Sequence, residues 1–420
     1  MLMLEKILKP FFKIRHHWQC ISFNEMAVLY ISKNMRVFAT KLTSTFSLIY
    51  IYKFTHSIWI IPICILIYYI AKFTGSMIAL FYISKNGPKH GMLLANILFI
   101  PALVLMASMG IFGKEMGLIV ALISAVFKGI SVSVENISYN VDFSKAKTAK
   151  KVGKQLGVAY ILEHISSSIA PAIGGFLAIF FGVEKLFVVS SVILVLTTIP
   201  LLTTKEQVKP VRKISFRGFP WRNYKHLLII CYSCGMAWNS LYIWSFFAPV
   251  FLLKGINAYG SAGVLSSISS IAALVSAFIY GKVIDKNKER GILKIGAIFM
   301  GLVFSLRIFI SSNPLLLGIL EIIAAVAMNG FNMANFKGLY GEADESGMRM
   351  QYLFLYEIGM NTVSVIAISL FVILFFALQG VDPSGELSMK IMILISSLSI
   401  LPMVFTNYRI YRNKKRQFQE

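Results

Sequence analysis

Residues 157–175 have the sequence GVAYILEHISSSIAPAIGG, an apolar stretch that nevertheless carries an acid, Glu163. Steps of three and four residues place Ser167, Ala170 and Gly174 near Glu163 on one face of a helix. An ionisable side chain inside a membrane is costly, so it usually faces protein or a watery cavity. Small residues let another helix approach closely. The stretch therefore predicts a membrane helix that packs against neighbours and holds a buried acid among them.

The composition of the whole chain indicates an all-α, polytopic membrane protein. Its 420 residues are 57% hydrophobic and 14% charged, with a mean hydropathy of +0.73, whereas a soluble domain carries roughly 25% charged residues. Continuous apolar runs of about 20 residues favour spanning helices over a β-barrel, whose strands would alternate with period two. The net charge of +23 is spread over short loops, so we expect no nucleic-acid partner.

The apolar runs predict twelve spanning helices. Their approximate ranges are 36–54, 57–84, 90–112, 116–140, 153–181, 184–203, 226–252, 258–281, 291–311, 314–336, 351–378 and 388–408. Most of the 41 Lys and Arg residues then fall on one side of the membrane, which the positive-inside rule assigns to the cytoplasm. We therefore expect a multi-pass protein of the cell membrane with both termini in the cytoplasm.

The longest polar connection divides the predicted spans into two halves. Two six-helix bundles, 23–203 and 226–408, are joined by a basic cytoplasmic linker at 204–225. An amphipathic cytoplasmic segment at 1–22 precedes them, and a basic cytoplasmic tail at 409–420 follows. Pro and Gly residues punctuate the linker, which indicates a connection on the inner surface.

A weak internal repeat relates the two halves. AYILEH at 159–164 resembles LFLYEI at 353–358, so that an acid occupies the same position in each segment. SKNGPKHG at 84–91 corresponds to IDKNKERG at 284–291 at nearly the same offset. Similar elements at a near-constant offset predict two structurally related bundles.

The segment GKVIDKNKER, at 281–290, resembles an inner-loop motif of the major facilitator superfamily of secondary transporters. The matching positions are Gly281, Asp285, Lys286 and Arg290. The glycine permits close helix contact, while the acid and the basic residues pair across helix ends and hold one conformation at the cytoplasmic side. We therefore expect these residues to form a gating motif.

The opening stretch resembles the fifth-helix motif of the same family, in Gly157, Pro171, Gly174 and Gly175. We expect these residues to form a packing motif. The resemblance implies twelve transmembrane helices in two pseudo-symmetric six-helix bundles, working by alternating access as a monomer without a cofactor or metal. Because the family associates this motif with antiporters, the resemblance favours export.

In such a fold the first, fourth, seventh and tenth spans line the central cavity, and each of them carries polar side chains here. A polar stripe along a membrane helix indicates a hydrated interior, because lipid penalises it. The candidate substrate-cavity residues are Lys41, Thr45, Lys128, Ser131, Glu135, Trp238, Asn239, Tyr242, Asn329 and Asn332. Lys41 and Lys128 favour an anionic or zwitterionic solute, whereas Glu135 leaves cation export open. Packing of the aromatic residues is the alternative.

Three acids are candidates for proton coupling: Glu163, Glu357 and Glu135. A carboxyl group held in an apolar interior can load and release a proton near neutral pH. The alternative is a structural acid, bonded to a neighbouring helix or paired with Lys41 or Lys72. The sequence leaves both interpretations open.

We therefore expect a secondary transporter that moves a small organic solute through the lipid bilayer, coupled to a proton or another ion. No HExxH, P-loop or other enzyme motif is present, so we do not expect an enzyme. One alternative is a receptor or scaffold that kept the fold but lost transport. Leu80 and Ser84, which replace the Gly and Asp of the inner-loop motif in the first half, favour that alternative mildly. Another alternative is a flippase for lipids or lipid-linked sugars.

Overall fold

The computed structural model describes residues 25–146, 152–202, 214–253, 258–285, 288–310, 313–406, 408, 409 and 411. Nearly all of these residues are helical, and none of them lies in a strand. The predicted amphipathic segment at 1–22 and most of the predicted tail at 409–420 lie outside this described part of the chain.

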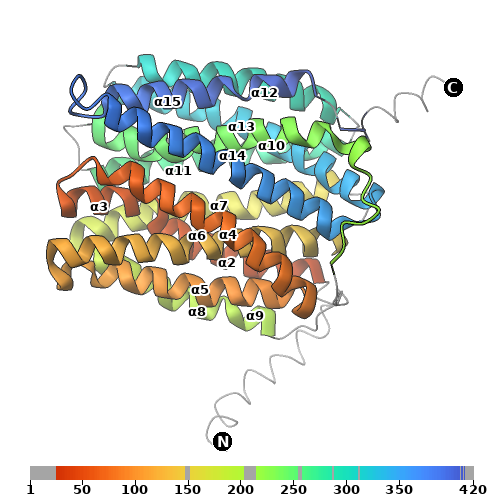
Figure 1. Cartoon of the computed structure of the whole chain (residues 1–420), viewed down its shortest axis with the longest axis horizontal. Coiled ribbons are helices and arrows are strands. Elements are labelled where there is room, and N and C mark those ends of the chain that lie inside the picture. The colour runs from red at the N-terminus through yellow and green to blue at the C-terminus, as the bar shows by residue number, and fades with distance from the viewer. Residues whose placement is uncertain are drawn as a thin grey trace, which may run out of the picture.

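Each predicted apolar run overlaps with helical structure. The helices of the first half are α2 (Glu25–Ser44), α3 (Ser47–Thr55), α4 (Ile60–Asn86), α5 (Pro88–Ser108), α6 (Gly113–Ala146), α7 (Val152–Phe181), α8 (Val183–Leu196) and α9 (Thr198–Leu202). Those of the second half are α10 (His226–Phe247), α11 (Ala258–Asp285), α12 (Glu289–Leu306), α13 (Pro314–Glu345), α14 (Arg349–Ala377) and α15 (Glu386–Leu398). In Figure 1, α2 to α9 lie in one half of the molecule and α10 to α15 in the other.

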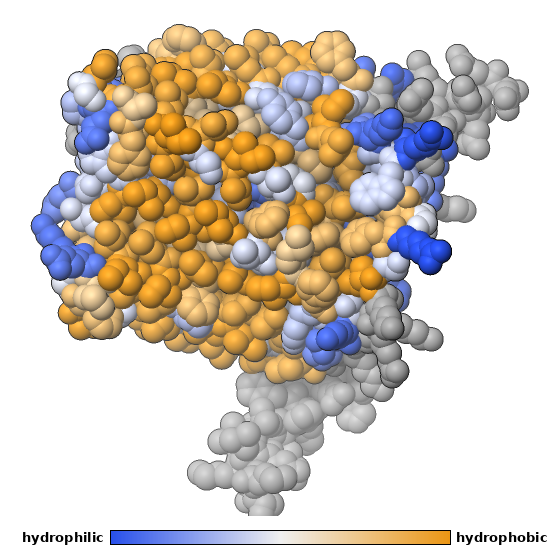
Figure 2. Space-filling model, in the orientation of Figure 1, coloured by the Kyte–Doolittle hydropathy of each residue, from blue (hydrophilic) through white to orange (hydrophobic). Residues whose placement is uncertain are grey.

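The surface of the helices suits a bilayer. Ten helical segments of the described chain are long and apolar enough to cross a membrane. Figure 2 shows apolar side chains over the middle of the visible face and hydrophilic ones gathered toward two opposite ends. Phe81, Leu228 and Leu370 are 63%, 75% and 62% exposed. Contiguous apolar patches of this kind are rare on soluble monomers, so hydrocarbon is the medium that would cover them.

The first span differs from its predicted range of 36–54. Its helix begins at Glu25, and it is interrupted between Ser44 and Ser47, although neither Gly nor Pro occurs there. Two hydroxyl groups bond to carbonyl groups around the break: Thr43 Oγ1 donates to Thr40 O (3.3 Å), and Ser47 Oγ donates to Thr43 O (3.1 Å). Hydroxyls that bond to the preceding turn often bend helices, which accounts for a break that no helix-breaking residue marks.

The two halves meet along α7 and α11, where glycines allow the backbones to touch. A Cβ atom added to Gly157 would lie 3.4 Å from Gly281 Cα, and one added to Gly263 would lie 2.7 Å from the carbonyl oxygen of Pro171. A Cβ atom on Gly175 would lie 3.7 Å from Gly263 Cα. Because Gly157 and Gly175 are near opposite ends of α7, this seam between the halves is closed along its length.

Gly174 packs in the other direction. A Cβ atom added to it would lie 2.6 Å from Leu42 O and 2.7 Å from Phe46 Cε2, at the break between α2 and α3. Adjacent glycines therefore let α7 lie close to a helix of its own half on one side and to α11 of the other half on the other side.

The glycine seam gives a testable prediction about stability. Gly263→Ala drives a methyl group into the Pro171 backbone, so we expect it to lower the stability of the detergent-solubilised protein by about 1–3 kcal/mol. Gly318→Ala is the matched control, because no atom outside its immediate helical neighbourhood lies within 4 Å of the added Cβ. Ala is favoured over Gly inside helices by roughly 0.5–1 kcal/mol, so this variant should melt no lower than wild type. Equal melting temperatures for the two variants would contradict the seam.

Candidate functional site

A carboxylate of the second half makes polar contacts with two helices of the first half. Glu357 on α14 is 2% exposed. Its Oε1 accepts hydrogen bonds from Asn136 Nδ2 on α6 (3.1 Å) and from Asn361 Nδ2 (3.4 Å). Lys72 Nζ on α4 lies 4.0 Å from the same oxygen, and Asn361 also donates to Ser76 Oγ on α4 at 2.9 Å. The predicted Glu357 therefore lies at a polar junction between the halves.

Two further polar links cross between the halves. His164 Nε2 on α7 lies 3.2 Å from Asn329 Oδ1 on α13, so the imidazole donates this hydrogen bond in the tautomer that carries its proton on Nε2. Asn329 Nδ2 also donates to Ser276 Oγ on α11 at 2.8 Å. Tyr340 OH on α13 donates to Asn140 Oδ1 on α6 at 2.7 Å. Asn329, predicted as a cavity residue, thus has its amide bonded within the packed seam.

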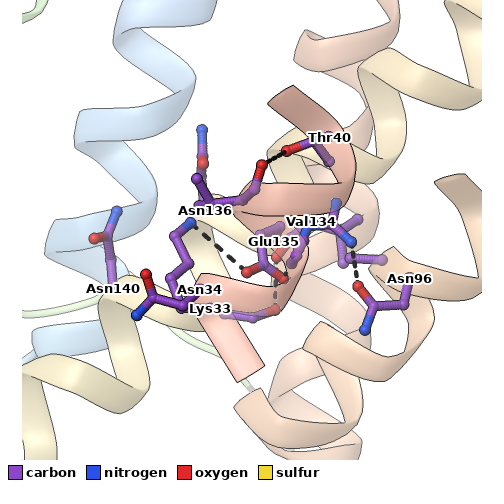
Figure 3. Close-up of polar contacts among 12 residues, drawn as sticks. Lys33, Asn34, Thr40, Asn96, Val134, Glu135, Asn136 and Asn140 are labelled. Carbon is purple, nitrogen blue, oxygen red and sulfur yellow. Dashed lines mark hydrogen bonds and ion pairs between the residues drawn. The ribbon is translucent and has the colours of Figure 1, made fainter. Parts of the chain in front are cut away.

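Glu135 belongs to an ion cluster inside the first half. Lys33 Nζ lies 3.7 Å from its Oε1, and Arg36 Nε lies 3.7 Å from its Oε2. Figure 3 shows Lys33 and Glu135 pointing toward each other, with Asn96 nearby. The Arg36 guanidinium also donates to Asn96 Oδ1 and to Ser131 Oγ, the latter at 2.8 Å. The predicted cavity residues Glu135 and Ser131 therefore hold α2, α5 and α6 together.

Lys128 and Tyr242 line a cavity of about 30 Å³. Its wall is formed by Thr43, Ser47, Leu48, Ile51, Cys64, Tyr68, Phe99, Ala102, Leu103, Met106, Ala121, Ser124, Ala125, Lys128, Phe187 and Tyr242. Tyr242 on α10 stacks on Tyr68 on α4, with ring centroids 5.1 Å apart. Lys128 Nζ lies 5.8 Å from the centroid of Tyr68. A water molecule needs about 10–15 Å³ of such volume, so the cavity has room for a few waters at most.

The other predicted cavity residues do not join this cavity. Trp238 and Asn332 line a separate space of about 10 Å³ between α10, α12 and α13, and Trp238 is 46% exposed. Asn239 is fully buried, and its amide has no hydrogen-bond partner within the described part of the chain. Thr45 lies in the break between α2 and α3. The ten predicted residues are thus divided among several environments.

Lys41 and Glu163 lie near one another without a direct ion pair. Glu163 on α7 interacts electrostatically with Lys41 on α2, and also with the hydroxyl groups of Tyr139 and Tyr160. Lys41 in turn lies within electrostatic range of Lys128. Glu163 of α7 and Lys128 of the cavity wall are therefore both within electrostatic range of Lys41.

A family model described as the Major Facilitator Superfamily matches residues 29–368. The chain belongs to this superfamily. A comparison with curated proteins found no significant match. Together with the apolar helices, the match shows that this superfamily member is a multi-pass membrane protein with a transporter fold.

Solved transporter structures have the same fold. The human organic anion transporter MFSD10 (TETRAN) is 11% identical, with a TM-score of 0.66, over 91% of this chain and 98% of that chain. A bacterial homologue of the iron transporter ferroportin in the outward-facing state is 12% identical, with a TM-score of 0.65, over 93% and 99%. The proton:xylose symporter XylE bound to 6-bromo-6-deoxy-D-glucose is 12% identical, with a TM-score of 0.65, over 91% and 95%. Identities this low show the fold alone.

The residues of the predicted gating motif lie at the inner end, which is the end predicted to face the cytoplasm. Gly281 is buried near Gly157, Asp285 ends α11, and Arg290 lies in the first turn of α12. Lys286 lies outside the described residues. The gating role of these residues stays a prediction, and the inner end also contains a pair of an acid and a base that was not predicted from the sequence.

Glu289 and Lys337 form this inner-end pair, with Lys337 Nζ 3.5 Å from Glu289 Oε2. Lys337 also donates to Ile284 O at 2.8 Å, so a cation of α13 caps the last turn of α11. A cation at a helix C-terminus is stabilising. No sequence signal links a residue on the tenth span to this loop, because their contact depends on how the helices pack.

Lys33 and Arg36 were also missed as partners of Glu135. Their spacing of three residues places both on one face of α2, which is a signal that the sequence does contain. A second missed pair joins Arg307 Nη2 to Glu321 Oε1 at 3.0 Å, and Trp244 Nε1 donates to the same oxygen at 2.6 Å. Arg307 is 2% exposed, so the superfamily member carries buried ion pairs in both halves.

The Glu135 cluster gives a prediction with an internal control. Arg36→Met leaves the buried Glu135 short of one cation, so we expect it to lower the free energy of unfolding by about 3–5 kcal/mol. Arg349→Met removes a 2.6 Å contact with Asp344, but those side chains are 35% and 36% exposed, so its effect should be about 0–1 kcal/mol. Melting of both variants in the same detergent measures the difference. A smaller loss for Arg36→Met than for Arg349→Met would show that Glu135 does not depend on Arg36.

Proposed function

We propose that this chain is a secondary active transporter that moves a small organic solute across the membrane by alternating access. In this proposal twelve helices span the cell membrane in two pseudo-symmetric six-helix bundles, at 23–203 and 226–408. The linker at 204–225 and both termini face the cytoplasm, and the protein works as a monomer without a cofactor. Membership of the superfamily and the polar contacts between the halves support the proposal.

The observation that carries the proposal is the position of Glu357 at the polar junction of α14 with α4 and α6. Its contacts with Asn136 and Lys72 join α14 to α6 and α4, so any rocking of one half against the other must break them. Protonation removes the charge that attracts Lys72. A proton therefore shifts the balance between two arrangements of the halves in the way that a coupled ion must.

Glu163 is the second candidate for proton coupling. It lies on α7, which contacts α11 of the other half, and its charge acts on Lys41. Glu135 is the weakest of the three candidates, because Lys33 and Arg36 compensate it within one half and no rocking motion needs to separate them. We propose export in exchange for protons, on the resemblance of α7 to the packing motif associated with antiporters.

A receptor or scaffold with the same fold remains the alternative, and the small volume of the cavity favours it. A bundle that is permanently closed would, however, pair its buried charges internally. Within the described residues, Lys128 forms no ion pair with an acidic side chain. An uncompensated cation beside a cavity is costly in an apolar interior and favours transport.

Proton coupling can be tested in proteoliposomes that contain the pH dye pyranine. The vesicles are challenged with a panel of anionic, cationic and neutral organic solutes that do not cross the bilayer unaided. Solute entry in exchange for protons makes the interior alkaline, whereas symport makes it acidic. We expect at least one solute class to give an alkaline signal with wild type, and Glu357→Gln or Glu163→Gln to abolish it.

The control is Glu386→Gln, whose carboxylate pairs with Lys390 at 2.8 Å and is 32% exposed. It should leave the signal within about twofold of wild type, because an exposed ion pair contributes little. Unchanged proton flux in both Glu357→Gln and Glu163→Gln would overturn the coupling proposal. Absence of any response to the whole panel would favour the receptor or scaffold.

A further inference from the structure

We infer that the solute is an organic anion with one negative charge and an apolar body, and that Lys128 binds its anionic group. The inference rests on the proposed transport function and names the substrate class of its site. It comes from the balance of charges around the cavity and from the composition of the cavity wall.

The first step is that two of the three predicted acids are already compensated. Glu135 lies 3.7 Å from both Lys33 and Arg36. Glu357 lies 4.0 Å from Lys72 and accepts hydrogen bonds from two amides. Because a cationic solute would have to displace these partners, neither acid is available to it in this arrangement.

The second step is that basic side chains outnumber acidic ones on the cavity side of α6. Lys41 on α2 and Lys128 on α6 lie within electrostatic range of one another, and Glu163 is the acid within range of Lys41. Two basic side chains and one acid leave one basic side chain without an acidic counterpart. A solute with one negative charge would supply that counterpart.

The third step concerns Lys128 itself. Its ammonium lies over the ring of Tyr68, and no acidic side chain of the described chain lies within ion-pair distance of it. A ring face attracts a cation more weakly than a carboxylate does when both are desolvated. Lys128 can therefore form a stronger electrostatic interaction with an anionic group than it forms with the Tyr68 ring. That group would bind in the cavity that Lys128 lines.

The cavity wall suits an anionic head on an apolar body. Ser47 and Leu48 line it from the first turn of α3, and a helix N-terminus carries partial positive charge. Thr43 belongs to the same wall, while most of the remaining lining is aliphatic or aromatic. The hydroxyl groups of Thr43, Ser47 and Ser124 already donate to backbone carbonyl groups. The Lys128 side chain and the N-terminus of α3 are therefore the groups that would orient the head group. The apolar lining favours a hydrocarbon or aryl body.

The position of Tyr242 explains how such a solute enters. It is the one residue of the second half among those that line the cavity, and its ring stacks on Tyr68. Separation of the halves would move Tyr242 away and widen the cavity on that side beyond its present volume of about 30 Å³.

Two permanently charged probes and one neutral probe, all with a phenyl ring, test the inference without passive proton leakage. Benzenesulfonate is the anionic probe, phenyltrimethylammonium the cationic probe and benzyl alcohol the neutral one. Thermal melting of the purified full chain measures binding, because a ligand that binds only the folded state raises its stability. Uptake of the two charged probes into the proteoliposomes measures transport. The variants are Lys128→Met, Lys128→Arg and Lys72→Met.

We expect benzenesulfonate to raise the melting temperature of wild type in a saturable way and phenyltrimethylammonium not to do so. Lys128→Met should weaken the response to benzenesulfonate at least tenfold, and Lys128→Arg should restore most of it because the charge is kept. Without a probe, Lys128→Met should melt no lower than wild type, since it removes an uncompensated charge. Lys72→Met should melt lower, since it deprives Glu357 of its cation.

Two results would overturn the inference. One is a stabilising response or uptake of phenyltrimethylammonium that exceeds that of benzenesulfonate. The other is an unchanged response of Lys128→Met to benzenesulfonate. An alkaline signal driven by cationic or neutral solutes alone would leave the proposed transport function standing while refuting the anion. Absence of a proton-flux signal with every solute would refute the transport function itself.

Discussion

The structure depends on one carboxylate that two halves of a membrane protein share. Glu357 lies on α14 of the second half, yet Asn136 of α6 donates to it and Lys72 of α4 lies 4.0 Å away. In a low-dielectric interior such contacts are strong while they exist, and the groups are costly when left alone. The halves can therefore separate here only if something else compensates the charge. In the proposed mechanism a proton on Glu357 is that compensation, and it would link ion binding to movement of the halves.

The two halves also meet along the glycine seam between α7 and α11. Backbones lie in close contact at Gly157 and Gly263, so no long side chain separates α7 from α11 at these two positions. In the proposed mechanism this would let the two helices part there without repacking of long side chains. The Glu135 cluster differs, because Lys33 and Arg36 tie helices within one half. The molecule thus combines internally braced halves with a seam of glycines and a few polar links, as rigid-body rocking requires.

Much of the fold could be predicted from the sequence, because a bilayer demands continuous apolar helices. The run at 351–378 is an example, since the helix extends over Arg349–Ala377. What the pattern lacks is the rotation of each helix about its axis. Trp238 and Asn239 are neighbours in a predicted polar stripe, yet one is 46% exposed and the other fully buried. The site could therefore be assigned only from the packed structure. Among the described residues Lys128 has no acidic partner, whereas Glu135 and Glu357 already have cationic ones.

Alternating access is the central claim, and double electron–electron resonance measures it most directly. In a variant without native cysteines, one spin-label pair at the exposed Asn86 and Lys288 reports the inner ends of the halves, and another at the exposed Lys114 and Gly380 reports the outer ends. We expect acidification to lengthen the distance between the labels at one end of the molecule and to shorten the distance at the other end. Glu357→Gln should shift the populations of the two arrangements of the halves in the same direction at neutral pH. Single, unchanged distances at both ends across pH and in the variant would contradict alternating access.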